Sequence, residues 1–158
     1  MNERTVRHAT IAIERSFRAA PARVFAAWAN PEERRRWDCP GDGWVIAEHE
    51  QDFRVGGRER SRFGPPDDPA FLSEGTFLDI VPDARIITAG TMHDHDGRAT
   101  ATLCTIELYP EGRGTRLFLT DQSAFFAVET QADRTEGWGE ILDRLSAYLE
   151  RATHAQEH

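Results

Sequence analysis

The stretch DRTEGWGEILDRLSAYLERA, residues 133–152, decides the fold of this chain. Asp133 followed three residues later by Glu136 has the spacing of a capping box, which predicts that a helix begins here. The apolar residues then recur every three or four positions and form one stripe, comprising Trp138, Ile141, Leu142, Leu145, Leu149 and Ala152. A helix of this length, about 30 Å, needs a large apolar surface of the same chain to cover that stripe.

The residues before this helix supply that surface as an antiparallel meander. Short runs typical of strands are separated by turn sequences rich in Gly, Pro and Asp. One of these separators, Asp96-Gly97, is a strong hairpin signal. The expected strands cover residues 44–53, 57–63, 71–81, 85–93, 99–109 and 115–122.

A further strand and two short helices precede the meander. Alternation predicts the strand over residues 8–18, and Pro21 opens a helix whose apolar face comprises Val24, Phe25 and Trp28. Asn30 and Pro31 then suit the N-cap and first position of a second helix, with Glu33 placed to reach back to the cap. The predicted order is β-α-α-β6-α in a single α+β domain over residues 1–158, with an ordered core at about residues 6–152.

Charge and composition exclude several classes of function. The chain of 158 residues carries a formal net charge of −8, and all nineteen of its basic residues are Arg. Because Lys is absent, a Schiff base, a pyridoxal phosphate attachment and a phosphate-loop lysine are excluded. The acidic balance disfavours nucleic acid and anionic membranes as partners. We interpret the basic run Arg34-Arg35-Arg36, which has acidic neighbours, as a solvated helix face.

No segment predicts insertion into a membrane. The longest apolar run, residues 24–29, is far shorter than the roughly 20 residues of a membrane-spanning helix. Residues 1–7 contain no apolar stretch of the kind found in secretory signals, so we expect a cytoplasmic protein. Cys39 and Cys104 have neither CxxC spacing nor neighbouring His ligands, and both are expected to be reduced and without a functional role.

A set of short motifs, in order along the chain, carries a family resemblance. They are RSFRAAPARVFAAWANPE (residues 15–32), Trp37 with Pro40, DFRVGG (52–57), GTFLDIVP (75–82), and EGW (136–138) with the leucines that follow. With these motifs the chain resembles the activator of heat-shock protein 90 ATPase homologue family of the START-like (SRPBCC, Bet v-type) superfamily over roughly residues 8–150. The resemblance implies a helix-grip fold, in which a curved antiparallel sheet wraps the long C-terminal helix and leaves a cavity between them.

The resemblance leaves three functions open. START-like proteins include lipid and hormone binders, polyketide cyclases and eukaryotic co-chaperones, and the co-chaperones carry an additional N-terminal domain for which we expect no room here. We favour a module that binds a small apolar or amphipathic ligand between the sheet and the C-terminal helix. The alternatives are an enzyme of cyclase, aromatase or hydrolase type, using polar cavity residues such as His49, Arg60 or Glu107, and a protein-interaction module similar to the co-chaperones. No cofactor is expected, and the sequence leaves a homodimer or a protein partner open.

Aromatic residues are the main candidates for the wall of this cavity. Most of them must pack in the core, but a curved sheet and a helix cannot meet everywhere, so some line the gap that remains. Trp138 lies at the start of the helical stripe with Leu142 one turn further on, and we expect this face to look into the cavity. The predicted cavity residues are Trp28, Trp37, Trp44, His49, Phe63, Phe77, Phe118, Trp138 and Leu142.

Two polar turns resemble a catalytic site and a metal site, and we expect neither to have such a function. In DFRVGG, Asp52 and Arg54 share one face of a strand and can pair, while Gly56 and Gly57 permit a bend of the sheet, so the motif is expected to be structural. The segment HDHD at residues 93–96 is expected to be a polar turn without a metal, because no distant Cys or His completes four ligands. The sequence also has no G-x-S-x-G, so nothing predicts a serine nucleophile.

Overall fold

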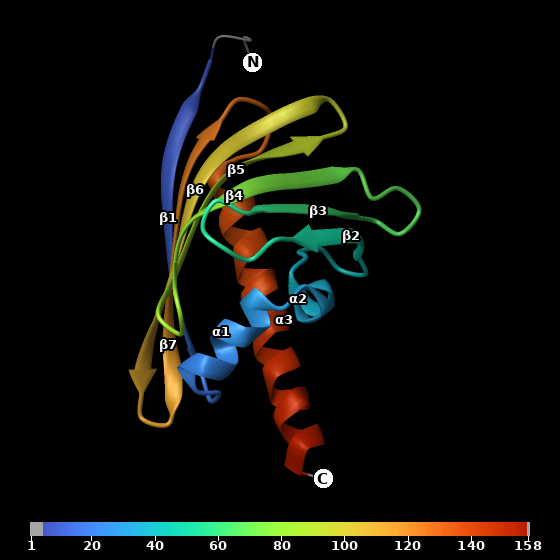
Figure 1. Ribbon diagram of the computed structural model, residues 1–158. Coiled ribbons are helices and arrows are strands. Elements are labelled where there is room, and N and C mark those ends of the chain that lie inside the picture. The colour runs from blue at the N-terminus through green and yellow to red at the C-terminus, as the bar shows by residue number, and fades with distance from the viewer. Residues whose placement is uncertain (1–4, 158) are drawn as a thin grey trace.

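The computed structural model describes residues 5–157, with side chains through residue 152 (Figure 1). The elements are β1 (Arg7–Phe17), α1 (Pro21–Ala29), α2 (Pro31–Trp37), β2 (Val45–Gln51), β3 (Arg58–Gly64), β4 (Phe71–Val81), β5 (Arg85–Asp94), β6 (Gly97–Glu111), β7 (Gly114–Phe125) and α3 (Gln131–Glu157). This order confirms the predicted α+β helix-grip fold, and the predicted element ends lie within a few residues of the observed ones.

The described strands form a seven-stranded antiparallel sheet in the order β1-β7-β6-β5-β4-β3-β2. The first strand therefore pairs with the last, and the short strands β2 and β3 form the opposite side of the sheet. Figure 1 shows this sheet curving around α3. Gly75 and Gly90 lie directly opposite each other on β4 and β5, and a Cβ on Gly90 would lie 2.1 Å from the carbonyl oxygen of Glu74. This close approach of the two strands therefore requires glycine.

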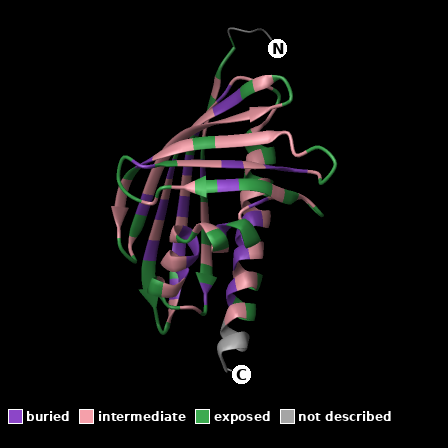
Figure 2. Cartoon of the chain, turned by 45° about the vertical axis from the view of Figure 1, so that its right-hand side comes forward, coloured by how far each residue is buried: buried purple, intermediate pink, exposed green. Residues whose placement is uncertain are grey.

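Alternation along β7 explains why the sheet and the long helix pack. Leu117, Leu119 and Phe125 point to the concave face and are at most 1% exposed. The predicted stripe of α3 meets this face, where Leu142 and Leu145 are completely buried. Figure 2 shows buried and exposed positions alternating along the long strands in the same way. The hydrophobic effect thus holds α3 against the inner face of the sheet.

The start of α3 differs from the prediction by a few residues. The backbone N–H of Thr130 donates to Asp133 Oδ2 at 3.0 Å, and the N–H of Asp133 donates to Thr130 Oγ1 at 3.1 Å. This reciprocal capping box makes Thr130 the N-cap, so the predicted pairing of Asp133 with Glu136 is wrong. The helix also continues past residue 152 to Glu157. None of the helices within residues 5–157 is long and apolar enough to cross a membrane.

The start of α2 is confirmed in part. Asn30 Oδ1 accepts a hydrogen bond from the backbone N–H of Glu32 at 2.9 Å, as an N-cap should. Glu33 does not reach back to the cap. Its carboxylate instead accepts hydrogen bonds from Arg23 and from the Tyr148 hydroxyl, both at 2.6 Å, and this contact ties α1 and α2 to α3.

The DFRVGG segment forms a tight turn between β2 and β3. Asp52 and Arg54 pair at 2.7 Å, and both side chains are more than half exposed. The turn docks on β4, because the Gly56 N–H donates to the Phe77 carbonyl and the Phe77 N–H donates to the Gly57 carbonyl. Gly56 has a φ of +85°, and a Cβ on Gly57 would lie 1.9 Å from the carbonyl oxygen of Asp52. The geometry of this turn therefore depends on its glycines.

Candidate functional site

A cavity of about 470 Å³ lies between the first half of α3 and the inner face of β3 to β6. Its volume falls within the range of small-molecule pockets. Gly75, Gly90 and Gly137 are among the residues that line it, and their lack of side chains leaves room between sheet and helix. The segment between α2 and β2 closes one side of the cavity. It is held to α3 because Arg144 donates to the carbonyl oxygens of Cys39 and Gly41.

Three stacked aromatic rings contribute apolar surface to this cavity. Trp44 stacks on Phe71 with ring centroids 5.2 Å apart and an interplanar angle of 22°. Phe71 stacks in turn on Phe63, at 5.7 Å and 17°. All three residues line the cavity, so they offer apolar surface to a molecule bound there.

The structure places part of the predicted set on the cavity wall. Four of the nine predicted residues line it: Trp28, Trp44, Phe63 and Trp138. The other five lie elsewhere among the described residues: Trp37, His49, Phe77, Phe118 and Leu142.

Packing and strand alternation explain the positions of four of these residues, Trp37, Phe77, Phe118 and Leu142. Phe118 lies on the outer face of the sheet, because Leu117 and Leu119 on either side of it point inward, and its ring meets Tyr109 edge to face at 5.6 Å. Phe77 and Leu142 are completely buried in the core. Trp37 packs behind the wall, with its ring centroid 4.7 Å from that of Trp28.

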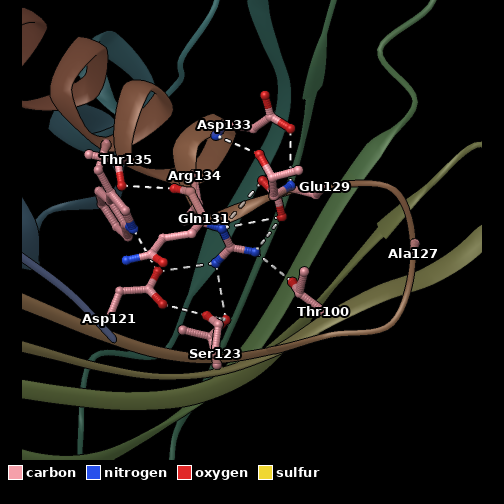
Figure 3. A network of polar contacts seen from close by, with 12 residues as sticks. Thr100, Asp121, Ser123, Ala127, Glu129, Gln131, Asp133, Arg134 and Thr135 are labelled. Carbon is pink, nitrogen blue, oxygen red and sulfur yellow. Dashed lines mark hydrogen bonds and ion pairs between the residues drawn. The ribbon is translucent and has the colours of Figure 1, made fainter. Parts of the chain in front are cut away.

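One end of the cavity, near the N-terminus of α3, contains a buried polar network around Asp121 (Figure 3). Arg134 Nη1 donates to Asp121 Oδ2 at 3.1 Å, and Trp138 Nε1 donates to the same oxygen at 2.7 Å. Ser123 donates to the other carboxylate oxygen, and the Thr102 and Ser123 hydroxyls lie 2.7 Å apart. The Asp121 carboxylate, which is completely buried, therefore receives hydrogen bonds at both oxygens.

The guanidinium of Arg134 also has several hydrogen-bond partners. It donates to the Thr100 hydroxyl at 2.6 Å, to Thr102 at 3.0 Å and to the Glu129 carboxylate at 2.8 Å, and it lies 5.5 Å from the centroid of the Phe125 ring. Burial alone lowers the pKa of Arg134, but Glu129 and Asp121 outweigh burial and the pKa is raised. The network is thus a charged and internally paired unit that fixes the first turn of α3 to β6 and β7.

A second buried guanidinium, that of Arg34 on α2, lies at the opposite end of the cavity. It binds Asp38, and it donates to Glu59 and Gln51 at 3.0 Å each. Its charge also lies 5.5 Å from the Trp28 ring centroid. Burial lowers the pKa of Arg34, but Asp38 and Glu59 outweigh burial, so the pKa is raised.

The burial of Arg34 corrects the sequence-based interpretation of the basic run. Arg35 and Arg36 are exposed as expected, but Arg34 is only 9% exposed. It lies three residues before Trp37 and four before Asp38, so all three share one side of α2. That spacing is the signal in the sequence that could have identified it.

His49 belongs to the same polar cluster and lies behind the cavity wall. Its Nε2 lies 2.9 Å from Gln51 Oε1, and the residue is 2% exposed. Burial, together with the nearby Arg34 charge, lowers the pKa of His49. Its imidazole is therefore neutral at neutral pH.

Two residues that line the cavity each have a fully buried polar atom without a hydrogen-bond partner among the described residues: the indole Nε1 of Trp28 and the hydroxyl of Ser61. Trp28 is 4% exposed and Ser61 is 8% exposed. Ser61 lies two residues from Glu59 on β3 and therefore on the same strand face. Both residues thus lie at the Arg34 end of the cavity, with these atoms packed against protein.

The other polar residues considered from the sequence do not form a reactive group. Glu107 lies on the outer side of β6, where it accepts a hydrogen bond from Tyr109, and Arg60 pairs with Glu48 at an exposed position. His95 lies 3.4 Å from Asp68, and both side chains are more than half exposed. Within the described residues, no group of three or more His, Cys, Asp or Glu side chains is placed to hold a metal ion.

The two cysteines are free and buried. Burial raises the pKa of the Cys39 thiol to about 11. Cys104 lines the cavity, and burial, with Asp121 nearby, raises the pKa of its thiol as well. Both side chains are therefore protonated thiols at neutral pH and poor nucleophiles.

Comparison with known proteins relates this geometry to a family. A family model described as Activator of Hsp90 ATPase homolog 1-like protein matches residues 18–150. Among solved structures, a protein from Rhizobium loti is 43% identical, covers 91% of this chain and 99% of its own, and has a TM-score of 0.81. An uncharacterized protein from Rhizobium leguminosarum is 37% identical, with 93% and 97% coverage and a TM-score of 0.83. An AHSA1-like protein from Aeromonas hydrophila is 27% identical, with 92% and 94% coverage and a TM-score of 0.73.

No curated protein matched the chain. The family model nevertheless covers most of the sequence, and the two rhizobial structures match nearly the whole of both chains. The helix-grip arrangement is that of START-like domains, a fold that supports ligand binding in general. The chain therefore belongs to the family of Activator of Hsp90 ATPase homolog 1-like proteins.

Proposed function

We propose that this protein binds a small apolar or amphipathic molecule in the cavity between the sheet and α3. The observation that carries the proposal is the cavity itself, about 470 Å³ in volume and walled by the stacked rings of Trp44, Phe63 and Phe71. An apolar molecule gains free energy when it leaves water for such a surface. The buried polar groups at the two ends of the cavity give an amphipathic molecule places to bond.

Pairing of the charged groups favours binding over acid–base catalysis. A general acid or base needs a titratable group that can exchange a proton with a substrate. Asp121 is occupied by Arg134, Trp138 and Ser123, and Glu59 is paired with Arg34. These carboxylates support the walls of the cavity and are poorly suited to proton transfer.

The test is a thermal-shift and tryptophan-emission screen of lipids, flavonoids and polyketide-like aromatic molecules. A true ligand raises the melting temperature, because a molecule that binds only the folded state stabilises it by about 2.7 kcal/mol at a hundredfold excess over its Kd. Tryptophan emission should change saturably, since Trp28, Trp44 and Trp138 all line the cavity.

A matched pair of variants locates the binding. Thr88 lines the cavity on β5, whereas Thr105 on β6 is not among the lining residues and lies on the opposite face of the sheet. Thr88→Phe should fill the cavity and abolish binding, while Thr105→Phe should leave it unchanged. If neither a thermal shift nor an emission change occurs with any compound, the proposal is wrong. The next candidate would be a protein-binding surface on the outer face of the sheet, where Leu103 and Tyr109 are exposed.

A further inference from the structure

Each end of the cavity holds one guanidinium between two carboxylates. The two groups are Arg134 with Asp121 and Glu129, and Arg34 with Asp38 and Glu59. None of these six side chains is more than 23% exposed. Because one positive charge meets two negative charges in each group, each end of the cavity is left with an excess of negative charge that water screens poorly.

The first turns of α3 add further carboxylates to the cavity wall. Asp133, Glu136 and Glu140 line the cavity, and their spacing of three and four residues places them along one side of the helix. Glu140 accepts a hydrogen bond from the backbone N–H of Gly41 at 2.7 Å, and Asp133 caps the helix. None of the three forms an ion pair with another described residue, so their charges are not balanced by an arginine.

The other arginines near the cavity do not reverse this balance. Arg60 lines the cavity but pairs with Glu48 on β2. Arg144 and Arg7 bind backbone carbonyl oxygens, in the segments after α2 and before α3 respectively, and neither is among the lining residues. In all, seven acidic residues and three arginines line the cavity, and each of these arginines already has a carboxylate partner.

This balance of charge discriminates between ligands of opposite sign. A charged ligand loses part of its hydration when it enters the cavity, and only an opposite charge compensates for that loss. An anion would meet arginines that are already paired and an excess of carboxylates. A cation would be attracted by the same excess, and the attraction is stronger between protein walls than in bulk water.

We infer that the cavity selects an amphipathic cation, a molecule that joins a positively charged group to an apolar ring system, and that it discriminates against anions. The cavity and the apolar surface of Trp44, Phe63 and Phe71 receive the ring system. The unbalanced carboxylates determine which sign of charge is accepted. This inference rests on the proposed ligand-binding function and narrows it to a chemical class.

Three naphthalene probes of similar size and different charge test the inference. They are 2-naphthylmethylammonium, a cation, 2-naphthylmethanol, which is uncharged, and 2-naphthoate, an anion. Dissociation constants are measured by isothermal titration calorimetry at pH 7.5. The ammonium should bind about three- to tenfold more tightly than the alcohol, and the alcohol at least about threefold more tightly than 2-naphthoate.

A second titration series at 0.5 M NaCl separates the cavity from the protein surface. The whole chain carries a formal net charge of −8, which attracts any cation weakly. At this salt concentration the Debye length is about 4 Å, so attraction to the exposed surface is largely screened. A preference that arises from buried carboxylates should persist, with the three probes in the same order.

Variants then assign the preference to the carboxylates. Glu129→Gln and Glu59→Gln each remove one negative charge and leave the neighbouring arginine with one carboxylate, so each should reduce the preference for the ammonium over the alcohol at least about twofold. The matched control is Glu107→Gln, which removes the same charge on the outer side of β6 and should retain the preference. Melting temperatures verify folding, and Glu136→Gln, at an exposed position of α3, replaces a variant that does not fold.

The outcomes separate this inference from the proposed function. Equal binding of the ammonium and the alcohol, binding of 2-naphthoate as tight as that of either, a preference lost at 0.5 M NaCl, or one unchanged in the cavity variants would overturn the inference while leaving a ligand cavity. Failure of all three probes to bind would contradict the inference and count against the proposed function as well. Binding that Thr88→Phe does not weaken would place the probes outside the cavity and overturn both.

Discussion

The two polar ends of the cavity differ in how completely their groups are paired. At the N-terminus of α3, the Ser123 hydroxyl donates to Asp121 within a network that also satisfies Arg134 and Trp138. At the Arg34 end, the Ser61 hydroxyl is also buried but has no partner among the described residues. Two buried serines on inner strand faces thus differ in what they contribute: the Ser123 hydroxyl stabilises a buried carboxylate, and the Ser61 hydroxyl gains no hydrogen bond from the described residues.

Trp138 and Trp28 repeat this contrast with indole groups. Both residues line the cavity, but the Trp138 N–H is bound to Asp121 at 2.7 Å while the Trp28 N–H has no partner within the described chain. The comparison teaches that contact with a cavity is not enough to identify a recognition group. Of these two indoles, only that of Trp138 is held by a hydrogen bond to the sheet, so its position is part of the paired network.

The largest expected effect comes from breaking the paired end. Arg134→Met would leave the completely buried Asp121 without its cation, and the free energy of unfolding should fall by about 3–5 kcal/mol. Urea denaturation measures this loss. Arg36→Met, at an exposed position on α2, is the control and should change stability by less than about 0.5 kcal/mol. Equal stability of the two variants would show that the network does not support the fold.

A smaller effect distinguishes the two serines. Ser123→Ala removes a donor to the buried Asp121 and should lower the free energy of unfolding by about 1–3 kcal/mol. Ser61→Ala removes a hydroxyl that has no partner, so stability should stay the same or rise. Thermal and urea unfolding of both variants provide the measurement. A loss of similar size in both would contradict the difference between the two ends.

The effect of pH on the free energy of unfolding through His49, at the Arg34 end, should be smaller still. Burial and the Arg34 charge lower the pKa of His49 in the folded state below its ordinary value of 6.5. As the pH falls below 6.5, the unfolded chain therefore binds a proton that the folded chain does not, and His49 lowers stability by at most about 1.4 kcal/mol per pH unit. His49→Gln should flatten this part of the stability profile between pH 7.5 and 5. An unchanged slope in the variant would contradict the pKa direction.

The smallest effect is expected outside the cavity, at the β2–β3 turn. The Asp52–Arg54 pair is exposed, with 56% and 70% of the side chains accessible, so Asp52→Ala should cost less than about 1 kcal/mol. Ligand binding should be unaffected, since neither residue lines the cavity. A loss of several kcal/mol, or loss of probe binding, would show that this turn is coupled to the site.

The elements of the fold could be predicted because the sequence pattern is consistent over long stretches. Alternation specified the strands, and the three- and four-residue spacing specified α3. The capping position was misassigned because two acceptable pairs overlap, Thr130 with Asp133 and Asp133 with Glu136, and spacing alone does not choose between them.

The site could be predicted only in part, for a different reason. Alternation with Leu117 and Leu119 was enough to exclude Phe118 from the inner face. The position of Asp121 on the same face as those leucines also signalled a buried carboxylate in need of a cation. By contrast, the local sequence does not distinguish Phe77, which is buried in the core, from Phe63, which lines the cavity. That difference depends on where the sheet and α3 move apart in the folded protein.

The most direct measurement is the response of the indole N–H resonances in ¹H–¹⁵N NMR spectra to a compound that raises the melting temperature in the thermal-shift screen. If the compound binds in the cavity, the Trp44 indole proton should shift saturably, because the Trp44 ring borders the cavity. The Trp138 indole proton, already bound to Asp121, should keep its hydrogen bond and stay protected from solvent exchange. A titration that leaves Trp44 unchanged, or that shifts only residues on the outer face such as Tyr109, would contradict the account.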